Sequence, residues 1–291
     1  MKRLIVCADD FGLDTAVNEA VETAHRDGIL TCASLMVGAM AAEDAVSRAR
    51  RLPGLRVGLH LVLVDGRPVS PPDSVRDLVD EAGGFDNRMV RAGFRFFFRP
   101  RVRRQLAREI RAQFEAFRAT GLRLDHVNAH KHIHLHPTVA GLILAIGREY
   151  GMTAMRVPAE PSGPLRRAGA VRPTAERIGS RLLALWVALL RRRLRRGGIA
   201  VNDHLFGLSW SGAMTEARFL SLLPYLPDGV SEVYFHPASR PSRALARTMP
   251  GYRHVEELAA LLSVAVRRSI AECGIGLVSY GDLVEGDAMR P

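Results

Sequence analysis

The residues best suited to chemistry in this sequence are two adjacent aspartates and several well-spaced histidines. Asp9 and Asp10 directly follow an apolar run, and His60, His130 and His236 each lie within or directly after another one. Carboxylates and imidazoles are ligands for divalent metal ions. A carboxylate or imidazole that stays unbound can act as a general base or acid. These residue types therefore predict a metal-assisted hydrolytic site, provided that the fold brings them together.

Each of these residues also has a purely structural alternative. Asp9 or Asp10 could cap the next helix, but Asp14 directly precedes the first helix-like segment and is the better N-cap. A single histidine inside a strand, such as His60, is more often a structural residue than a ligand. Polar residues at the ends of several strands are harder to explain in this way, and they favour a shared site.

Strand-like and helix-like segments alternate along the chain, with no internal repeat and no obvious linker. The expected strands are 4–8, 31–37, 57–61, 124–128, 154–158, 203–206, 231–237 and 276–280. The expected helices are 15–28, 41–51, 101–118, 138–150, 215–223 and 255–273. Seven or eight strands separated by helices predict an α/β fold, a (β/α) barrel or a close relative, built as one domain over residues 1–291.

In a barrel of this kind the carboxyl ends of all strands open onto one face. The two aspartates, His60, His130 and His236 would then meet in a single cup. One aspartate with two histidines leaves coordination positions open for water, as in a catalytic rather than a structural metal site.

The densest histidine tract is His130-x-His132-x-His134-x-His136. All four side chains would share one side if the tract continued as a strand. The tract leads into a helix, however, so only one or two of its histidines should reach the metal, with His134 as the reserve candidate. The alternative without a function is a histidine tract at the surface that binds metal only adventitiously.

The net charge of +11 is concentrated in two arginine-rich segments. Residues 88–111 contain nine arginines and one acid, residues 166–196 contain ten arginines and one acid, and the rest of the chain is mildly acidic. We expect basic helical insertions at about 85–120 and 159–198. A nucleic-acid-binding module is an alternative that this charge allows, but the arginines are not interleaved with a stacking platform for single strands.

The cysteines favour a reducing, cytoplasmic location. Cys7, Cys32 and Cys273 are odd in number, far apart and without a CxxC pair, so neither a disulfide framework nor a zinc knuckle is expected. The apolar run at the N-terminus is too short for a signal peptide. No stretch approaches the roughly 20 apolar residues that span a bilayer.

Four motifs together resemble the YdjC-like (ChbG-type) carbohydrate deacetylases, in order and spacing along nearly the whole chain. They are the segments at 8–12, 58–61, 129–134 and 235–238. The residues of the histidine tract and the presence of the arginine-rich segments are most similar to the hopanoid-biosynthesis-associated members (HpnK). The long segment between Pro158 and Ile199 departs from the family pattern.

This resemblance implies a distorted (β/α) barrel, of the glycoside hydrolase/deacetylase type, that removes the N-acetyl group from an amino sugar with one divalent metal ion. It makes Asp10, His60 and His130 the metal ligands, Asp9 the general base and His236 the general acid. Zinc suits two imidazoles and one carboxylate, and magnesium, manganese or cobalt could occupy the same ligands. The substrate is an N-acetylglucosamine-type sugar, lipid-linked as in hopanoid biosynthesis or a soluble chitooligosaccharide. A metallophosphoesterase is the other enzymatic alternative.

Two apolar segments bordered by arginines predict peripheral contact with an anionic membrane. Residues 182–190 are apolar, include Trp186 and are flanked by arginines on both sides, and residues 94–104 offer a second patch. Such helices lie in the headgroup region without crossing the bilayer. The alternative is a helix that packs on the barrel or at a homodimer interface.

Overall fold

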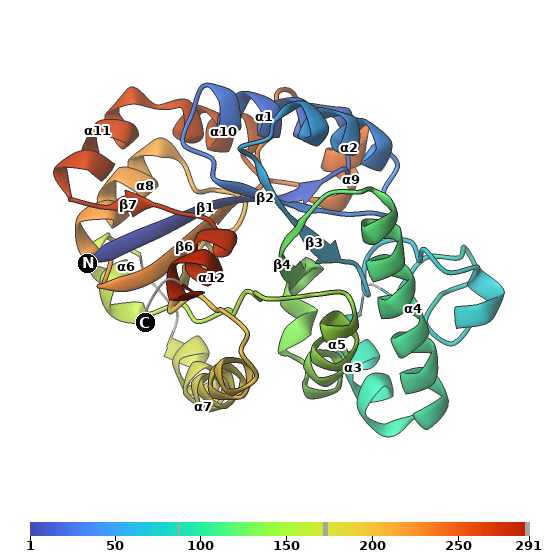
Figure 1. Ribbon diagram of the computed structural model, residues 1–291. Coiled ribbons are helices and arrows are strands. Elements are labelled where there is room, and N and C mark those ends of the chain that lie inside the picture. Colours follow the sequence, from blue (N-terminus) through green and yellow to red (C-terminus); the bar gives the residue numbers. More distant parts are fainter. Residues whose placement is uncertain (87, 171–173, 289–291) are drawn as a thin grey trace.

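The structure, a computed structural model, describes residues 1–86, 88–170 and 174–288, and the side chains of 174–182 and 286–288 lie outside that description. A sheet of seven parallel strands forms its centre, in the order β4-β3-β2-β1-β6-β5, with β7 beside the start of β1 (Figure 1). The strands are β1 (Lys2–Phe11), β2 (Cys32–Leu35), β3 (Arg56–Leu61), β4 (Leu124–Ala129), β5 (His204–Phe206), β6 (Gly229–Phe235) and β7 (Gly276–Leu277).

Helices surround the curled sheet, with α1, α2, α10 and α11 along one side and α4, α5 and α7 along others (Figure 1). The α-helices are α1 (Thr15–Arg26), α2 (Ala42–Arg51), α3 (Met89–Phe98), α4 (Pro100–Ala119), α5 (Pro137–Glu149), α6 (Ser162–Arg167), α7 (Thr174–Arg196), α8 (Glu216–Leu222), α9 (Arg243–Thr248), α10 (His254–Leu262), α11 (Val264–Glu272) and α12 (Tyr280–Ala288). Three short 3₁₀ turns are η1 (Pro72–Val75), η2 (His130–Leu135) and η3 (Leu223–Tyr225). Among the described helices, none has the length and apolar character needed to cross a bilayer.

The sequence pattern explains the central strand and the helix that follows it. Residues 4–11 of β1 are all buried, as expected for a run without polar alternation in a sheet covered on both faces. Asp14 is the N-cap of α1, since its side chain accepts a hydrogen bond from the Ala16 backbone N–H at 2.8 Å. The predicted α/β barrel-like fold is confirmed.

An extended segment at 153–159 lies between β4 and the chain near β5 and brings the two edges of the sheet together. The Arg156 backbone N–H donates to the Val127 carbonyl at 3.0 Å, and the Met155 N–H donates to the Ala200 carbonyl at 2.9 Å. The expected strand at 154–158 is therefore wrong as a regular strand, because only isolated bridges form. The Asn202 side chain, rather than a neighbouring strand, binds both the N–H and the carbonyl of Val157.

Two further expectations need correction. The predicted helix 255–273 is two helices, because Ser263 is extended and its hydroxyl caps α11 at the Val266 N–H. The predicted strand 276–280 stops at Leu277, since Asp282 accepts from Ser279 just before α12 begins. Within the helical insertion expected at about 85–120, α3 precedes the helix predicted at 101–118, and Arg99 separates the two. The other predicted strands and helices are confirmed to within a few residues.

Candidate functional site

A local irregularity near the end of β1 gives Asp9 and Asp10 different surroundings. Asp10 has a left-handed backbone with φ of 61°, and the pairing of β1 with β2 shifts register between Ala8 and Phe11. Such a conformation is costly for a residue other than glycine and is typical of functional sites. Gly12 follows with φ of 97°, a value that favours glycine. As a result, Asp9 contacts buried groups of the barrel while Asp10 contacts two histidines.

Asp10, His60 and His130 form a compact group at the carboxyl ends of β1, β3 and β4. Asp10 Oδ1 lies 3.3 Å from His60 Nε2 and 3.2 Å from His130 Nδ1. One ligand atom from each residue lies within 4.8 Å of the others. Asp10 Oδ2 is buried and has no hydrogen-bond partner among the described residues. Burial raises the pKa of Asp10, but His130 and His60 outweigh it and hold that pKa well below its usual range.

Asn128 determines which nitrogen of the His60 ring carries the proton. The Asn128 amide Nδ2 donates to Asp9 Oδ1 at 3.1 Å and to Ser34 Oγ at 2.8 Å. Its carbonyl oxygen must then accept from His60 Nδ1, 2.7 Å away. The lone pair of neutral His60 is therefore on Nε2, which faces Asp10, as in histidines that ligate metals.

This donor set fits a divalent metal ion. Two imidazole nitrogens and one carboxylate oxygen match the protein ligands of catalytic zinc sites, which leave a fourth position open. The unpartnered Asp10 oxygen and the oriented His60 ring are the observations in favour. The same ligands suit other divalent ions of the first transition row.

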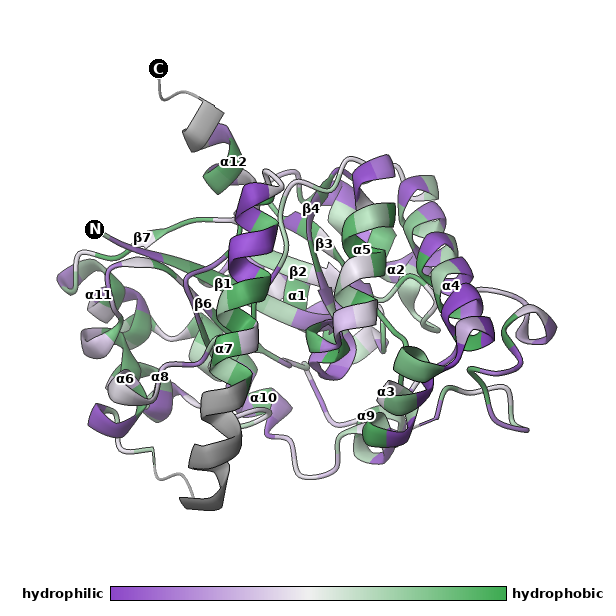
Figure 2. Ribbon diagram, turned by 90° about the horizontal axis from the view of Figure 1, so that it is seen from below, coloured by the Kyte–Doolittle hydropathy of each residue, from purple (hydrophilic) through white to green (hydrophobic). Residues whose placement is uncertain are grey.

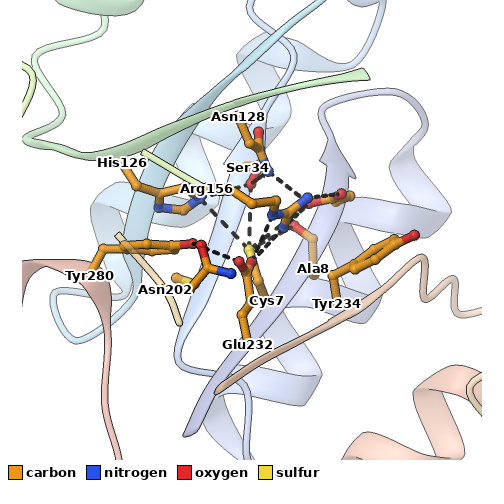
Figure 3. Close-up of polar contacts among 12 residues, drawn as sticks. Cys7, Ala8, Ser34, His126, Asn128, Arg156, Asn202, Glu232, Tyr234 and Tyr280 are labelled. Carbon is orange, nitrogen blue, oxygen red and sulfur yellow. Dashed lines mark hydrogen bonds and ion pairs between the residues drawn. The ribbon is translucent and has the colours of Figure 1, made fainter. Parts of the chain in front are cut away.

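Asp9 is held by a fully buried arginine, Arg156, that sequence reasoning missed. Figure 3 shows Arg156 beside Glu232. Arg156 Nη1 and Nη2 lie 2.6 and 2.8 Å from the two Asp9 oxygens, and Arg156 Nη2 also lies 2.6 Å from Glu232 Oε1. The Tyr280 hydroxyl donates to Glu232 at 2.6 Å. Burial raises the pKa of Asp9, but Arg156 and His60 outweigh it, so Asp9 stays ionised. An arginine between apolar residues at 154–157 was the available signal.

His236 directly follows β6, is half-buried and lines the same cavity as His60 and His130. Its backbone N–H donates to Glu257, and its carbonyl accepts from His254 Nδ1 at 2.6 Å. The rings of Tyr234 and Tyr252 pack edge-on against it, at centroid distances of 5.5 and 5.1 Å. Burial lowers the pKa of His236, so the ring releases a proton readily.

One cavity of about 380 Å³ brings Asp9, His60, His130 and His236 together. Its remaining lining comes mainly from the ends of β4 and β6 and from the loops after β5 and α9. These residues are Ala129, Lys131, His132, Leu208, Ser211, Tyr234, Thr248, Met249, Pro250 and Tyr252.

The histidine tract turns away from the strand after His130. Lys131 and His132 have positive φ values of 51° and 53°, so the tract coils into η2. His132 Nε2 lies 3.3 Å from the Tyr234 hydroxyl, whereas His134 is fully buried and His136 packs against Phe96. Of the tract, only His130 belongs to the group around Asp10.

A second buried group contains two of the three cysteines. Cys7 and Cys32 are far apart in sequence but are register partners on β1 and β2. Their sulfur atoms lie within 4.8 Å of each other and of a ring nitrogen of His126, and Cys7 Sγ lies 3.8 Å from His126 Nε2. His126 Nδ1 lies 2.9 Å from Asp125, and Ser34 Oγ lies 3.0 Å from His126 Nε2. All three residues are fully buried, and both thiols are free.

The fold and the site together define the class of the protein: a parallel α/β barrel with a carboxylate-histidine group at the carboxyl ends of its strands. The family model described as YdjC-like protein matches residues 3–272. The chain therefore belongs to the YdjC-like family.

Relatives match the chain from end to end. A carbohydrate deacetylase from Geobacillus stearothermophilus is 31% identical over 278 residues, which cover 95% of this chain and 96% of the relative. A carbohydrate deacetylase from Brevibacillus brevis is 29% identical over 285 residues, covering 97% and 99%. A crystal structure from Enterococcus faecalis V583, described in terms of cellobiose-phosphate cleavage, has a TM-score of 0.75 and 27% identity and covers 97% and 98%.

Proposed function

We propose that the protein is a metal-dependent carbohydrate deacetylase that hydrolyses the acetamide of an N-acetylglucosamine-type sugar. The observation that carries this proposal is the group of Asp10, His60 and His130, whose two histidines line one cavity together with Asp9 and His236. Membership of a family whose relatives are named carbohydrate deacetylases supports the reaction type.

In this proposal Asp10, His60 and His130 hold one divalent ion. When bound, such an ion acidifies a water molecule and polarises a carbonyl oxygen. Asp9 lines the cavity next to this group and acts as the general base. Because Arg156 keeps the Asp9 pKa low, Asp9 is a weak base toward ordinary water and needs an acidified one.

His236 acts as the general acid toward the leaving amine. Hydrolysis consumes one water and releases acetate and the free amine, whose nitrogen must gain a proton before the C–N bond breaks. The lowered pKa of His236 means that its ring is neutral before reaction at neutral pH. The proton that Asp9 takes from the attacking water passes to His236, and the low pKa of His236 makes its ring give that proton to the amine nitrogen as the C–N bond breaks.

We propose that the sugar is linked to a lipid and that the protein works at a cytoplasmic, anionic membrane surface. In Figure 2 green marks the apolar residues of α3 and of the middle of α7, whereas the end of α7 farther from its grey part is purple. The exposed members are Phe94, Phe97, Phe98, Leu183, Leu185 and Leu189. Phe96, which the sequence placed in the same patch, is instead buried against His136. Arg177 and Arg181, which precede the apolar segment 182–190, are among the residues whose side chains the structure does not describe.

Both helices border the turn that follows the metal-ligand histidine. The Phe97 ring of α3 lies 6.1 Å from the His136 ring, and the Trp186 indole N–H of α7 donates to the Leu135 carbonyl at 2.7 Å. A membrane bound to these faces would therefore lie beside the cavity. Exposed arginines such as Arg99 and Arg192 add attraction to anionic lipid, on the order of 1 kcal/mol each.

An acetate-release assay tests this function. The substrates are free N-acetylglucosamine, chitobiose and a lipid-linked N-acetylglucosamine, each with and without a chelator. We expect acetate release that the chelator abolishes and that added divalent ions restore, with the lipid-linked sugar as the best substrate. Release of phosphate from phosphorylated sugars, without acetate release, would instead identify a metallophosphoesterase.

A further inference from the structure

A second, apolar cavity of about 200 Å³ adjoins the catalytic one. The two share His130, Thr248 and Met249, so they meet at the metal-ligand histidine. The apolar wall comes from the loops that follow β1, β2 and β3 and from the end of α9. Its larger apolar side chains below the rim are those of Leu13, Met36, Val62, Val69 and Met249.

Buried polar side chains hold this wall in place on the β1–β2 side. Asn18, which is fully buried, accepts a hydrogen bond from the Gly12 N–H at 2.8 Å and donates to the Ala41 carbonyl at 2.9 Å. The Met36 N–H donates to the Phe11 carbonyl at 2.8 Å. The loop after β2 is therefore attached to the same turn that presents Asp10.

Helix α4 holds the opposite wall. Gln113 accepts from the Val62 N–H at 2.9 Å and donates to the Val62 carbonyl at 2.6 Å. Glu109, fully buried, accepts from the backbone N–H groups of Val69 and Ser70, both at 2.9 Å. Because the walls are fixed before a ligand arrives, little ordering is needed on binding.

We propose that this cavity is a subsite for an apolar group joined to the sugar, such as the alkyl part of an aglycone. The inference rests on the proposed deacetylase function and adds the place where the apolar part of the substrate binds. A group of the size of a water molecule or a methyl occupies about 30 Å³. The cavity, of about 200 Å³, is several times larger. The acetyl methyl alone does not account for a wall of five apolar side chains.

The open rim favours an aglycone over a longer N-acyl chain. Met40 on the rim is 99% exposed, and Arg67 and Arg247 beside it are also exposed. A group lying in the cavity can therefore continue outward to solvent or lipid. An acyl chain would instead end inside the cavity.

The test compares methyl, butyl and hexyl glycosides of N-acetylglucosamine. We expect kcat/KM to rise by roughly tenfold or more from methyl to hexyl, since each buried methylene contributes about three- to fourfold. A parallel series of glucosamines with N-butanoyl and N-hexanoyl groups should show no such rise. A rise along the acyl series and none along the glycoside series would overturn the assignment.

Two variants place the effect in this cavity. Val69→Asn makes the wall polar, and Ala39→Phe fills the space without adding polarity. Both should remove most of the gain from methyl to hexyl while leaving kcat/KM for the methyl glycoside unchanged. Val255→Asn changes an exposed valine on α10 and is the matched control.

Calorimetric binding of the hexyl and methyl glycosides separates this inference from the proposed function. If no glycoside is hydrolysed but hexyl binds at least roughly tenfold tighter than methyl, and Val69→Asn removes that difference, the subsite stands and the reaction is wrong. If the methyl glycoside is hydrolysed and chain length changes neither kcat/KM nor affinity, the subsite is wrong and the reaction stands.

Discussion

Both carboxylate oxygens of Asp9 are bound by the guanidinium of Arg156, with Nη1 at 2.6 Å from Oδ2 and Nη2 at 2.8 Å from Oδ1. The same guanidinium binds Glu232, and none of the three side chains is exposed by more than 3%. A single buried cation therefore holds two buried carboxylates. This arrangement fixes the orientation of Asp9 and explains why it stays ionised in spite of its burial.

Loss of Arg156 should be severely destabilising. Arg156→Met leaves Asp9 and Glu232 buried without a cation, and breaking a buried pair in this way costs about 3–5 kcal/mol. Urea unfolding measures the loss. Arg156→Lys keeps the charge but not the two-pronged contact, so it should lose less stability and still lose activity. An Arg156→Met protein within about 1 kcal/mol of the wild type would contradict this account.

Removing one metal ligand should remove the metal. Asp10, His60 and His130 supply the proposed ligand set from three strands, so His60→Ala should lose most of its metal and activity. Metal content by elemental analysis and acetate release are the measurements. His136→Ala is the matched control, because this histidine of the tract packs against Phe96 and is outside the group. Stoichiometric metal with near-normal turnover in His60→Ala would refute the site.

Loss of the general base or of the general acid should lower the rate without removing the metal. Asp9→Asn should retain the metal and lose rate by about 10²–10⁴-fold, the usual contribution of a positioned base. His236→Ala should likewise bind metal and turn over slowly. If Asp9→Asn loses its metal while Asp10→Asn retains it, the roles of the two aspartates must be exchanged.

The sequence predicted the elements that carry the site because strand ends are visible in it. Asp9, His60 and His236 each end or follow an apolar run, and barrel topology requires those ends to meet. The direction of each side chain was not predictable. It depends on the left-handed backbone at Asp10 and on the turn at Lys131 and His132, which break the alternation of a strand.

Contacts between residues that lie far apart in the sequence could not be predicted either. Arg156 stands alone in an apolar stretch, and only the fold shows that it lies between Asp9 and Glu232. Cys7 and Cys32 become neighbours through the β1–β2 register. The helix break at Ser263 and the early strand end before Ser279 arise from side-chain caps, a local competition that hydrophobic periodicity does not report.

Glu257 should make stability depend on pH near neutrality. Burial raises the pKa of Glu257 to about 7, although the N–H groups of His236 and Met214 oppose the shift. The fold thus favours the protonated form. Its contribution is fully present below the unfolded pKa and is lost as the pH rises through about 7.

Glu257→Gln is the test, because the amide does not titrate. The free energy of unfolding of the wild type should fall relative to the variant between about pH 4.5 and pH 8, by about 3 kcal/mol at most. Chemical unfolding at several pH values measures the difference. A constant offset between the two proteins across this range would show that Glu257 does not titrate as expected.

The exposed faces of α3 and α7 should bind an anionic lipid surface. Phe94 and Phe98 are 63% and 67% exposed and stack on each other at 6.2 Å, while Leu185 and Leu189 are 67% and 61% exposed. Two weak apolar anchors on one protein bind far better together than either alone. Basic residues near them restrict binding to anionic lipid and make it sensitive to salt. Flotation with anionic and neutral vesicles at low and high salt measures this.

The double variant Phe94→Ser with Phe98→Ser should weaken flotation by roughly tenfold or more, because each ring loses apolar area that the headgroup region would bury. Val264→Ser, at an equally exposed site on α11, should change nothing and is the control. Both proteins should release acetate from a soluble sugar at the wild-type rate, since neither position lines the cavity. Only release from a lipid-linked sugar in vesicles should fall in the double variant. Wild-type protein that is active on a soluble sugar but floats with neither kind of vesicle at low salt would rule out the membrane contact.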